Sequence, residues 1–225
     1  MCIRDSSKYS GEQRTFPNLF NREGVLNLEY DKWSKLCTPA HNVNVAFTRA
    51  IAGPVDYHSG GFRSATREEF EPRTFKPQVM GTRCHNIALF VVYENPMPMV
   101  ADSPDVYEGQ AGFDFVKEVP ATWDETRFLQ GEVGEFVVLA RRKADRWYLG
   151  GLTNWTEREI NVPLEFLGDG EFELRSWIDG ESADTKPNEV AFETQRVTAD
   201  SHLRVRMKSG GGFVAVAKPR TKQRR

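Results

Sequence analysis

From Trp123 onward the sequence alternates apolar and polar residues with a period of two, the spacing of a half-buried β-strand. Turn signals such as Gly168-Asp-Gly170 and Ser209-Gly-Gly-Gly212 separate these runs. The runs that we expect as strands are 136–140, 147–152, 159–164, 171–177, 190–197, 203–207 and 213–217. Short strands at intervals of roughly ten residues predict an antiparallel β-sandwich, which we place at residues 126–219.

The part of the chain before Trp123 has a different texture, with strand-like, loop-like and helical pieces joined by long polar loops. We expect a strand at 43–47 and helices at 78–93 and 112–119. The first of these helices ends at Asn95-Pro96, because proline cannot donate a hydrogen bond and disfavours helix in the preceding residue. Long polar loops are typical of a barrel that carries its chemistry on connecting loops. The change of pattern predicts a domain boundary near residues 123–133.

Charge, hydropathy and cysteine usage exclude several classes of protein. The formal net charge is -2, so we expect no nucleic-acid partner. No apolar run approaches the ~20 residues that span a bilayer. The three cysteines have no metal-site or disulfide spacing. We expect residues 1–6 to be a non-native leader, since they lack the apolar region of a signal peptide, and residues 220–225 to be a basic tail.

Two carboxylates, Glu23 and Glu29, lie six residues apart among apolar and aromatic residues. In one continuous strand they would share a face but stand ~20 Å apart, and in a helix they would point to different sides. They can cooperate only if the chain turns between them, which Gly24 permits. Such a pair suits glycoside hydrolysis or a Ca²⁺ site, and solvated surface glutamates are the ordinary alternative.

Several unusual segments occur in one order along the chain: RTFPN, NREGVLNLEYDKW, FTRAIAGPVDY and VPATWDE. In this order and spacing the chain resembles family 97 glycoside hydrolases from about Ser10 to Pro219. That family combines an N-terminal β-sandwich, a catalytic (β/α)8 barrel and a C-terminal β-sandwich that contributes to oligomer contacts. The resemblance implies an α/β plus all-β chain, with the C-terminal part of a (β/α)8 TIM barrel at residues 7–125 followed by the antiparallel β-sandwich at 126–219.

The resemblance also implies roles for individual residues. Glu29 corresponds to the family's catalytic general acid, and Glu23 and Glu29 are the expected metal residues for Ca²⁺. A further calcium-binding glutamate of the family falls near Asp5, where this chain departs from the pattern. The catalytic base or nucleophile lies upstream of this sequence.

Substrate contacts are expected from residues near the presumed last barrel strand. His41 and His58 flank that strand, and Asp56 and Tyr57 follow a Gly-Pro turn at the expected catalytic end. We take His41, Asp56 and Tyr57 as candidate substrate residues. Structural loop histidines and loop packing are the alternatives.

The implied function is that of a fragment of an exo-acting α-glycoside hydrolase. It would act with Ca²⁺ on terminal α-glucosyl or α-galactosyl residues of an oligosaccharide or small α-glycoside, and would be inactive as an isolated fragment. The resemblance places the full-length bacterial protein in the periplasm or outside the cell, as a homo-oligomer through the sandwich. The alternative is a non-catalytic oligomerisation or carbohydrate-binding β-sandwich protein with a vestigial barrel remnant.

Overall fold

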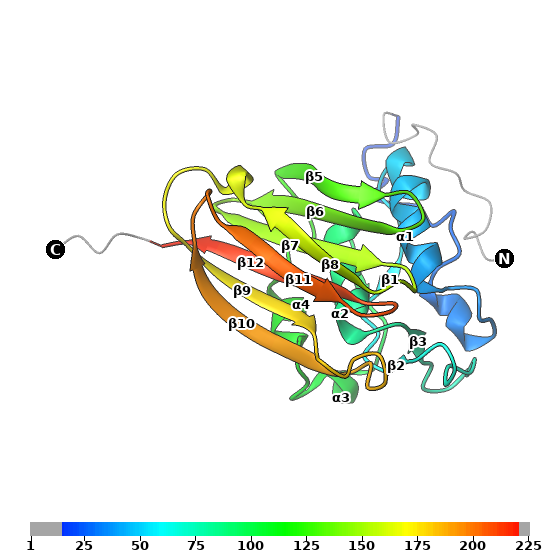
Figure 1. Cartoon of the computed structure of the whole chain (residues 1–225). Coiled ribbons are helices and arrows are strands. Elements are labelled where there is room, and N and C mark those ends of the chain that lie inside the picture. Colours follow the sequence, from blue (N-terminus) through cyan, green and yellow to red (C-terminus); the bar gives the residue numbers. More distant parts are fainter. Residues whose placement is uncertain (1–14, 221–225) are drawn as a thin grey trace.

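The computed structural model describes residues 15–220, so the expected leader, Asp5 and most of the basic tail lie outside it. A six-stranded antiparallel sheet, in the order β10-β9-β12-β7-β6-β5, forms the centre of the molecule (Figure 1). The strands of the C-terminal part are β5 Glu125–Glu132, β6 Phe136–Lys143, β7 Arg146–Thr153, β8 Arg158–Pro163, β9 Phe172–Asp179, β10 Val190–Val197, β11 His202–Met207 and β12 Gly212–Pro219, with a short 3-10 helix, η5, at Glu165–Leu167.

A two-stranded antiparallel sheet, β8 with β11, packs on one face of the large sheet (Figure 1). Val162 and Val205 of this pair bury their side chains in the same core as Leu149 and Phe213 of the large sheet. Buried and exposed residues alternate along β8 and β11 because only one side of the small sheet is covered. The antiparallel strands that the sequence predicted are therefore confirmed.

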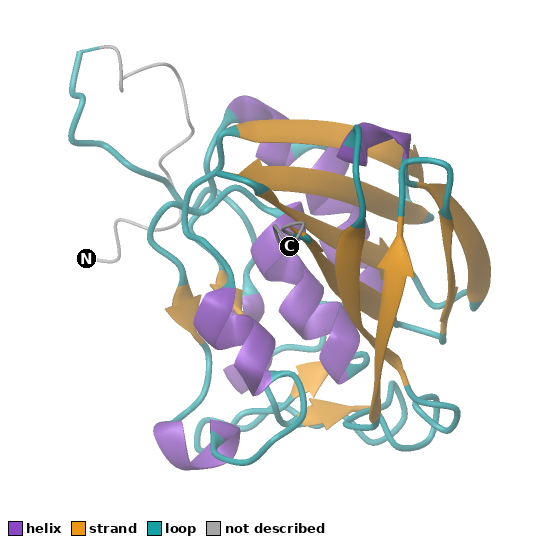
Figure 2. Ribbon diagram, turned by 90° about the vertical axis from the view of Figure 1, so that its left-hand side faces the viewer, coloured by secondary structure: helices purple, strands orange, loops and turns teal. Residues whose placement is uncertain are grey.

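Helices cover the opposite face of the large sheet (Figure 2). Helix α2, Arg83–Val92, has all ten residues buried and packs on β7 and β12, while α1, Pro39–Phe47, lies against β7. A Cβ atom at Gly150 of β7 would lie 2.7 Å from the Cβ atom of Val91, so only glycine allows this approach. Strands β7 and β12 are buried on both faces as a result.

Besides α1 and α2, residues 15–124 contain only short elements among the helices and strands described. They are η3 Leu28–Lys32, η4 Arg49–Ala52, α3 Pro104–Tyr107, α4 Phe113–Glu118 and four two-residue strands: β1 His58–Ser59, β2 Ser64–Ala65, β3 Val79–Met80 and β4 Met99–Val100. Strand β1 pairs with β4, and β2 with β3, both in parallel. No closed barrel is present in the described residues. Closure needs strands that hydrogen-bond continuously around a ring, and two isolated pairs do not provide them.

Three local predictions need correction. The predicted strand at 43–47 is part of helix α1, because the Thr38 side chain caps the helix at the His41 N–H (3.1 Å) and Pro39 begins it. The helix predicted at 78–93 begins only at Arg83, since Gly81 takes a φ of 88°. Strand β5 was missed because its exposed edge position gives no alternation. The helix predicted at 112–119 is confirmed as α4. No helix among the described residues is long and apolar enough to cross a membrane.

A buried histidine joins the two parts of the chain. The Nδ1–H of His85 in α2 donates to the Gly211 carbonyl oxygen (3.0 Å), and Nε2 accepts from Asn42 Nδ2 of α1 (3.0 Å). Burial lowers the pKa of His85 to about 4. Nearby, the buried Asp179 carboxylate accepts from the backbone N–H groups of Lys208 and Gly212, and burial raises the pKa of Asp179 to about 6. His85 is therefore a neutral hydrogen-bonding link at neutral pH.

We expect His85 to make the protein less stable in acid. An unfolded histidine titrates near pH 6.5, so the unfolded chain takes up this proton first as the pH falls. The stability given by neutral His85 is present above about pH 6.5 and is lost progressively toward pH 4, by about 3 kcal/mol in total. The measurement is urea unfolding at pH 7 and pH 4.5 for the parent chain and for His85→Gln, whose loss between these pH values should be smaller.

Asp179 acts in the opposite direction, because its raised pKa removes stability as the pH rises toward 6. The contribution of His85 is therefore the difference between the parent and His85→Gln in the free energy of unfolding that is lost between pH 7 and pH 4.5. His202→Gln, at an exposed position of β11, is the control. Equal pH dependence of the parent and His85→Gln would contradict the prediction.

Candidate functional site

A cavity of about 400 Å³ lies beside η3, and its walls come from η3 and from segments around β1, β3 and β4. Glu29, Lys32, His58 and Asp102 are its titratable residues. The Glu29 side chain is 15% exposed, and its Oε1 lies 3.9 Å from Lys32 Nζ. The cavity therefore combines a carboxyl group, a cation and an imidazole with partly apolar walls.

One buried amide, that of Asn27, organises the residues around this cavity. Asn27 is the N-cap of η3 and is 1% exposed. Its Oδ1 accepts from the Glu29 N–H (2.7 Å) and from His58 Nδ1 (3.1 Å), and its Nδ2 donates to Glu23 Oε1. The buried Cys37 thiol donates to the Asn27 carbonyl oxygen (2.8 Å). The amide thus joins Glu23, the backbone of Glu29 and the His58 ring.

The chain turns between Glu23 and Glu29, as their cooperation requires. Gly24 takes a φ of 50°, a left-handed conformation that favours glycine. Arg49 supports the turn from outside, since its Nε donates to the Glu23 carbonyl oxygen (3.0 Å). The turn brings both residues to Asn27, whose side chain binds the Glu23 carboxylate and the Glu29 backbone N–H.

The carboxylates of Glu23 and Glu29 are the type of ligand that Ca²⁺ binds, but two side chains are fewer than a calcium site needs. Ca²⁺ takes six to eight oxygen ligands, and carboxylates are among its preferred donors. Glu23 is 5% exposed, and a neutral amide donates to its Oε1. Within residues 15–220 no group of three or more His, Cys, Asp or Glu side chains could hold a metal ion. Glu23 and Glu29 can thus supply only part of a calcium site.

Of the predicted site residues only Glu29 lines this cavity, and Glu23 reaches it only through Asn27. His41 Nε2 lies 2.6 Å from the Leu26 carbonyl oxygen, and burial lowers the pKa of this histidine, so it supports the segment that carries Glu29. The Asp56 N–H donates to the Arg22 carbonyl oxygen (3.0 Å). Tyr57 is fully buried and its hydroxyl donates to Asn42 Oδ1 (2.6 Å), which makes it a core residue of this structure.

Sequence reasoning missed Asn27, Lys32 and Asp31. The signal for Asn27 was available, because asparagine is a preferred N-cap residue and the helical turn follows it directly. Asp31 gave no signal. It is fully buried, its carboxyl oxygens have no hydrogen-bond partner among the described residues, and burial raises its pKa to about 8. Asp31 is therefore a neutral carboxylic acid at pH 7.

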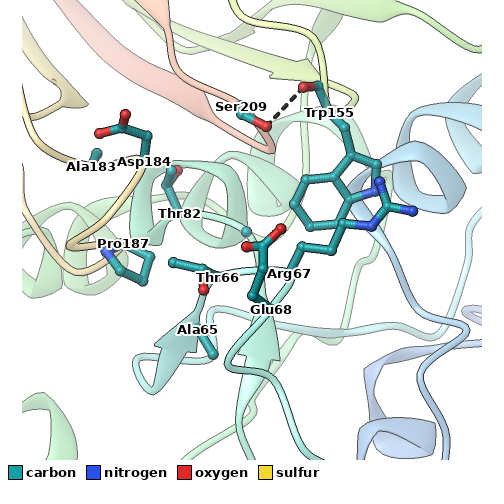
Figure 3. Close-up of a pocket in the computed structure, with 11 residues that line it drawn as sticks. Ala65, Thr66, Arg67, Glu68, Thr82, Trp155, Ala183, Asp184, Pro187 and Ser209 are labelled. Atoms are coloured by element: carbon teal, nitrogen blue, oxygen red, sulfur yellow. Dashed lines mark hydrogen bonds between the residues drawn. The ribbon is translucent and has the colours of Figure 1, made fainter.

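A smaller cavity of about 170 Å³ lies where the two parts of the chain meet (Figure 3). The Arg67 guanidinium lies 5.5 Å from the centre of the Trp155 ring, and the Ser209 hydroxyl donates to the Trp155 carbonyl oxygen (2.7 Å). Glu68 and Asp184 also line this cavity. The cavity beside Glu29 is the stronger candidate because it is larger than this one and because the Asn27 amide binds the backbone N–H of Glu29 and the ring of His58, two residues that line it.

Comparison with known proteins agrees with this architecture. Residues 122–218 match the family model described as the glycosyl-hydrolase 97 C-terminal, oligomerisation domain. A retaining α-galactosidase of Bacteroides thetaiotaomicron is 38% identical over 94% of this chain and 32% of its own length. A family 97 enzyme from Pseudoalteromonas sp. strain K8, solved in complex with panose, superposes with a TM-score of 0.84 at 31% identity, over 94% of this chain and 33% of that one. A β-arabinopyranosidase shares the fold, with a TM-score of 0.75 at 24% identity over 92% of this chain and 32% of that one.

The fold and these matches define residues 122–218 as a C-terminal domain of the type found in glycoside hydrolases. Residues 122–218 belong to the glycosyl-hydrolase 97 C-terminal family, and the chain as a whole is similar to family 97 enzymes in sequence and structure, which confirms the resemblance carried by its sequence motifs. The chain spans about a third of the length of the relatives that it matches.

We expect Asn27→Ala to loosen the site. The substitution removes the N-cap of η3 and leaves the Glu23 carboxylate, the Glu29 N–H and the His58 ring without this partner. The free energy of unfolding should fall by about 2 kcal/mol, measured by urea denaturation. Asn44→Ala, at an exposed position of α1, should cost almost nothing. Equal stability of the two variants would refute the role of Asn27.

Proposed function

We propose that this chain is part of a calcium-dependent, retaining α-glycosidase that removes terminal α-galactosyl residues, with Glu29 as the general acid. The single observation that carries the proposal is the position of Glu29 in the wall of a cavity, held by the Asn27 amide next to Glu23 and His58. The name of the B. thetaiotaomicron relative supports galactose and retention. Terminal α-glucosyl residues are the alternative, since the similar Pseudoalteromonas enzyme was solved with panose and with acarbose.

The role of Glu29 follows from its surroundings. A general acid donates a proton to the glycosidic oxygen as the bond to the leaving group breaks. In a retaining enzyme the same group then takes a proton from the water that releases the sugar. Apolar walls from Leu28, Val79 and Val100 limit the access of water to the carboxyl group, which is 15% exposed. The nucleophile would come from a part of the protein outside this sequence.

Glu23 and Glu29 would hold Ca²⁺ together with ligands from outside the described residues. A bound calcium ion supplies positive charge that orients sugar hydroxyl groups. Asn27 fixes the Glu23 carboxylate and the Glu29 backbone, so it sets the geometry of both proposed ligands. His58 is held by the same amide and lines the cavity, where its ring can contact the sugar.

We further propose that residues 7–125 complete the C-terminal part of a (β/α)8 barrel in the longer protein. Large apolar side chains are exposed in this part of the chain, among them Trp33, Leu36, Ile51, Met97 and Met99. Exposed apolar surface and short unpaired strand edges are what a partial barrel presents before closure. The chain alone would then lack both the nucleophile and a closed site. A periplasmic or secreted location remains our expectation from the resemblance.

We expect hydrolysis only from a form of the protein extended upstream through a complete catalytic domain. In that form, Glu29→Gln should lower kcat by about 10² to 10⁴-fold on an unactivated α-galactosyl disaccharide, since protonation of the leaving group is lost. The loss should be smaller on p-nitrophenyl α-galactoside, because p-nitrophenolate leaves without a proton. Release of galactose and of nitrophenol measures the two rates, and α-glucosides are assayed in parallel.

Glu173→Gln, at an exposed position of β9, is the matched control and should keep full activity. A chelator should abolish the activity of the extended enzyme, and added Ca²⁺ should restore it. Equal loss of rate on both substrates in Glu29→Gln would argue against a general acid. A folded extended form without activity would leave the alternative function as the better account.

The alternative is a non-catalytic oligomerisation or carbohydrate-binding module, and one comparison favours it. The matching family model describes an oligomerisation domain. The edge strands β5 and β10 carry exposed Phe128 (58%) and Phe192 (54%), which offer apolar surface to a second copy. Light scattering on the chain would show self-association, and Phe192→Ser would weaken association through β10.

A further inference from the structure

A third cavity, of about 490 Å³, lies next to the one beside Glu29 and shares Gln78 with it. Its walls carry four cationic side chains, those of Arg63, Arg73, Lys76 and Arg83. These side chains come from three segments of the chain. Arg63 lies before β2, Arg73 and Lys76 lie in the loop before β3, and Arg83 lies in the first turn of α2. The proposed glycosidase function assigns no role to this cavity.

Arg83 is a buried cation whose hydrogen-bond partners are all neutral. It is 5% exposed, and its guanidinium donates to Phe62 O (3.1 Å), Asn188 Oδ1 (3.0 Å) and Gln110 Oε1 (3.1 Å). Its Nε has no hydrogen-bond partner, and no carboxylate forms an ion pair with it, within residues 15–220. Asp102 acts on Arg83 only from beyond ion-pair distance. A buried charge without a direct ion-pair partner is costly, so an anion in this cavity would be stabilised.

Ser64 contributes a second buried group with unused capacity. It is 6% exposed, and its hydroxyl has no hydrogen-bond partner in the described part of the chain. Its backbone N–H and carbonyl are both bound by the Asn188 side chain, at 3.2 and 3.1 Å, so the residue is fixed in place. A hydroxyl can donate to an oxyanion. Arg83 and Ser64 both line the cavity, and each holds one buried polar atom without a hydrogen-bond partner among the described residues.

The nearby carboxylates compensate only part of the positive charge. Asp102 pairs with Arg63 and also accepts from the Phe62 N–H (2.8 Å). Glu71, on the same loop as Arg73, is engaged by Lys35 Nζ at 2.8 Å. Arg73 and Lys76 are exposed and form no ion pair with any described residue. The Asp105 carboxylate also interacts electrostatically with Arg63 and Lys76. The four cations of the cavity therefore face two carboxylates, Asp102 and Asp105, and a net positive charge remains.

We propose that Ser64, Arg73, Lys76 and Arg83 form a binding site for a phosphate or sulfate group. A guanidinium presents donors in a fork that matches the oxygens of such a group, and a lysine adds a mobile charge. The net positive charge favours a divalent oxyanion over chloride or a single carboxylate. Because the cavity adjoins the one beside Glu29, the group is either a free ion or a substituent on a sugar that reaches both cavities.

Titration calorimetry on the 225-residue chain at constant ionic strength tests the site, with inorganic phosphate, inorganic sulfate, galactose 6-sulfate and galactose as probes. We expect phosphate and sulfate to bind in the presence of excess chloride. Arg73→Ala and Lys76→Ala should each weaken binding by about fivefold, as expected for the loss of one charge-assisted contact worth about 1 kcal/mol. Ser64→Ala should weaken it by a similar factor without changing the charge.

Arg204→Ala and Lys218→Ala are the matched controls, because both residues are exposed on the sandwich and form no ion pair within the described residues. Equal losses in the controls would overturn the proposal, since they would show only general attraction to a basic protein. Absence of phosphate and sulfate binding would also overturn it. If galactose 6-sulfate binds more tightly than both inorganic sulfate and galactose, the site recognises a charged substituent on a sugar. If it binds no more tightly than sulfate, the site holds a free oxyanion.

Discussion

The packing of α2 on the centre of the large sheet is the contact on which the rest of the structure depends. All ten residues of α2 are buried, and the missing side chain at Gly150 lets the helix approach β7. From this position the helix reaches both parts of the chain. Its Asn86 carbonyl accepts from the Gly60 N–H (3.2 Å), and His85 binds the turn at Gly211. The segment that carries β1 and His58 is thereby fixed relative to the sheet, and the cavity beside Glu29 follows from it.

The same helix also explains why the two parts of the chain form one packed unit. Its first turn holds Arg83, whose guanidinium reaches Phe62 and Asn188 on either side. Its middle packs on Tyr148, Val214 and Val216 of the sheet. A helix that is buried on every side cannot leave the sheet without exposing a large apolar surface to water. The sandwich therefore serves as the support against which the candidate site is built.

The two adjacent cavities differ in the polar groups that surround them. The cavity beside Glu29 is organised by one neutral amide that holds a carboxylate, a backbone N–H and an imidazole. The neighbouring cavity is organised by cations whose partners are mostly neutral oxygens. Asp102 lines the first and pairs with Arg63 of the second. A substrate with both hydroxyl groups and a charged substituent would meet complementary groups in this arrangement, which links the proposed hydrolysis to a defined class of sugar.

The sequence by itself determined the strands of the C-terminal part other than β5, the possibility of a turn at Gly24 and the family resemblance, because each of these depends on local periodicity, on a local conformation or on continuous motifs. It misread 43–47, where Val-Asn-Val alternation occurs inside a helix that a distant sheet buries. Only the tertiary structure decided the sites. Asn27 meets His58 across 31 positions, and Arg83 meets Asn188 across 105. Tyr57 became a core residue because Tyr93 packs on it. Such contacts arise from the packing of separate segments, and no local pattern in the sequence records which segments will meet.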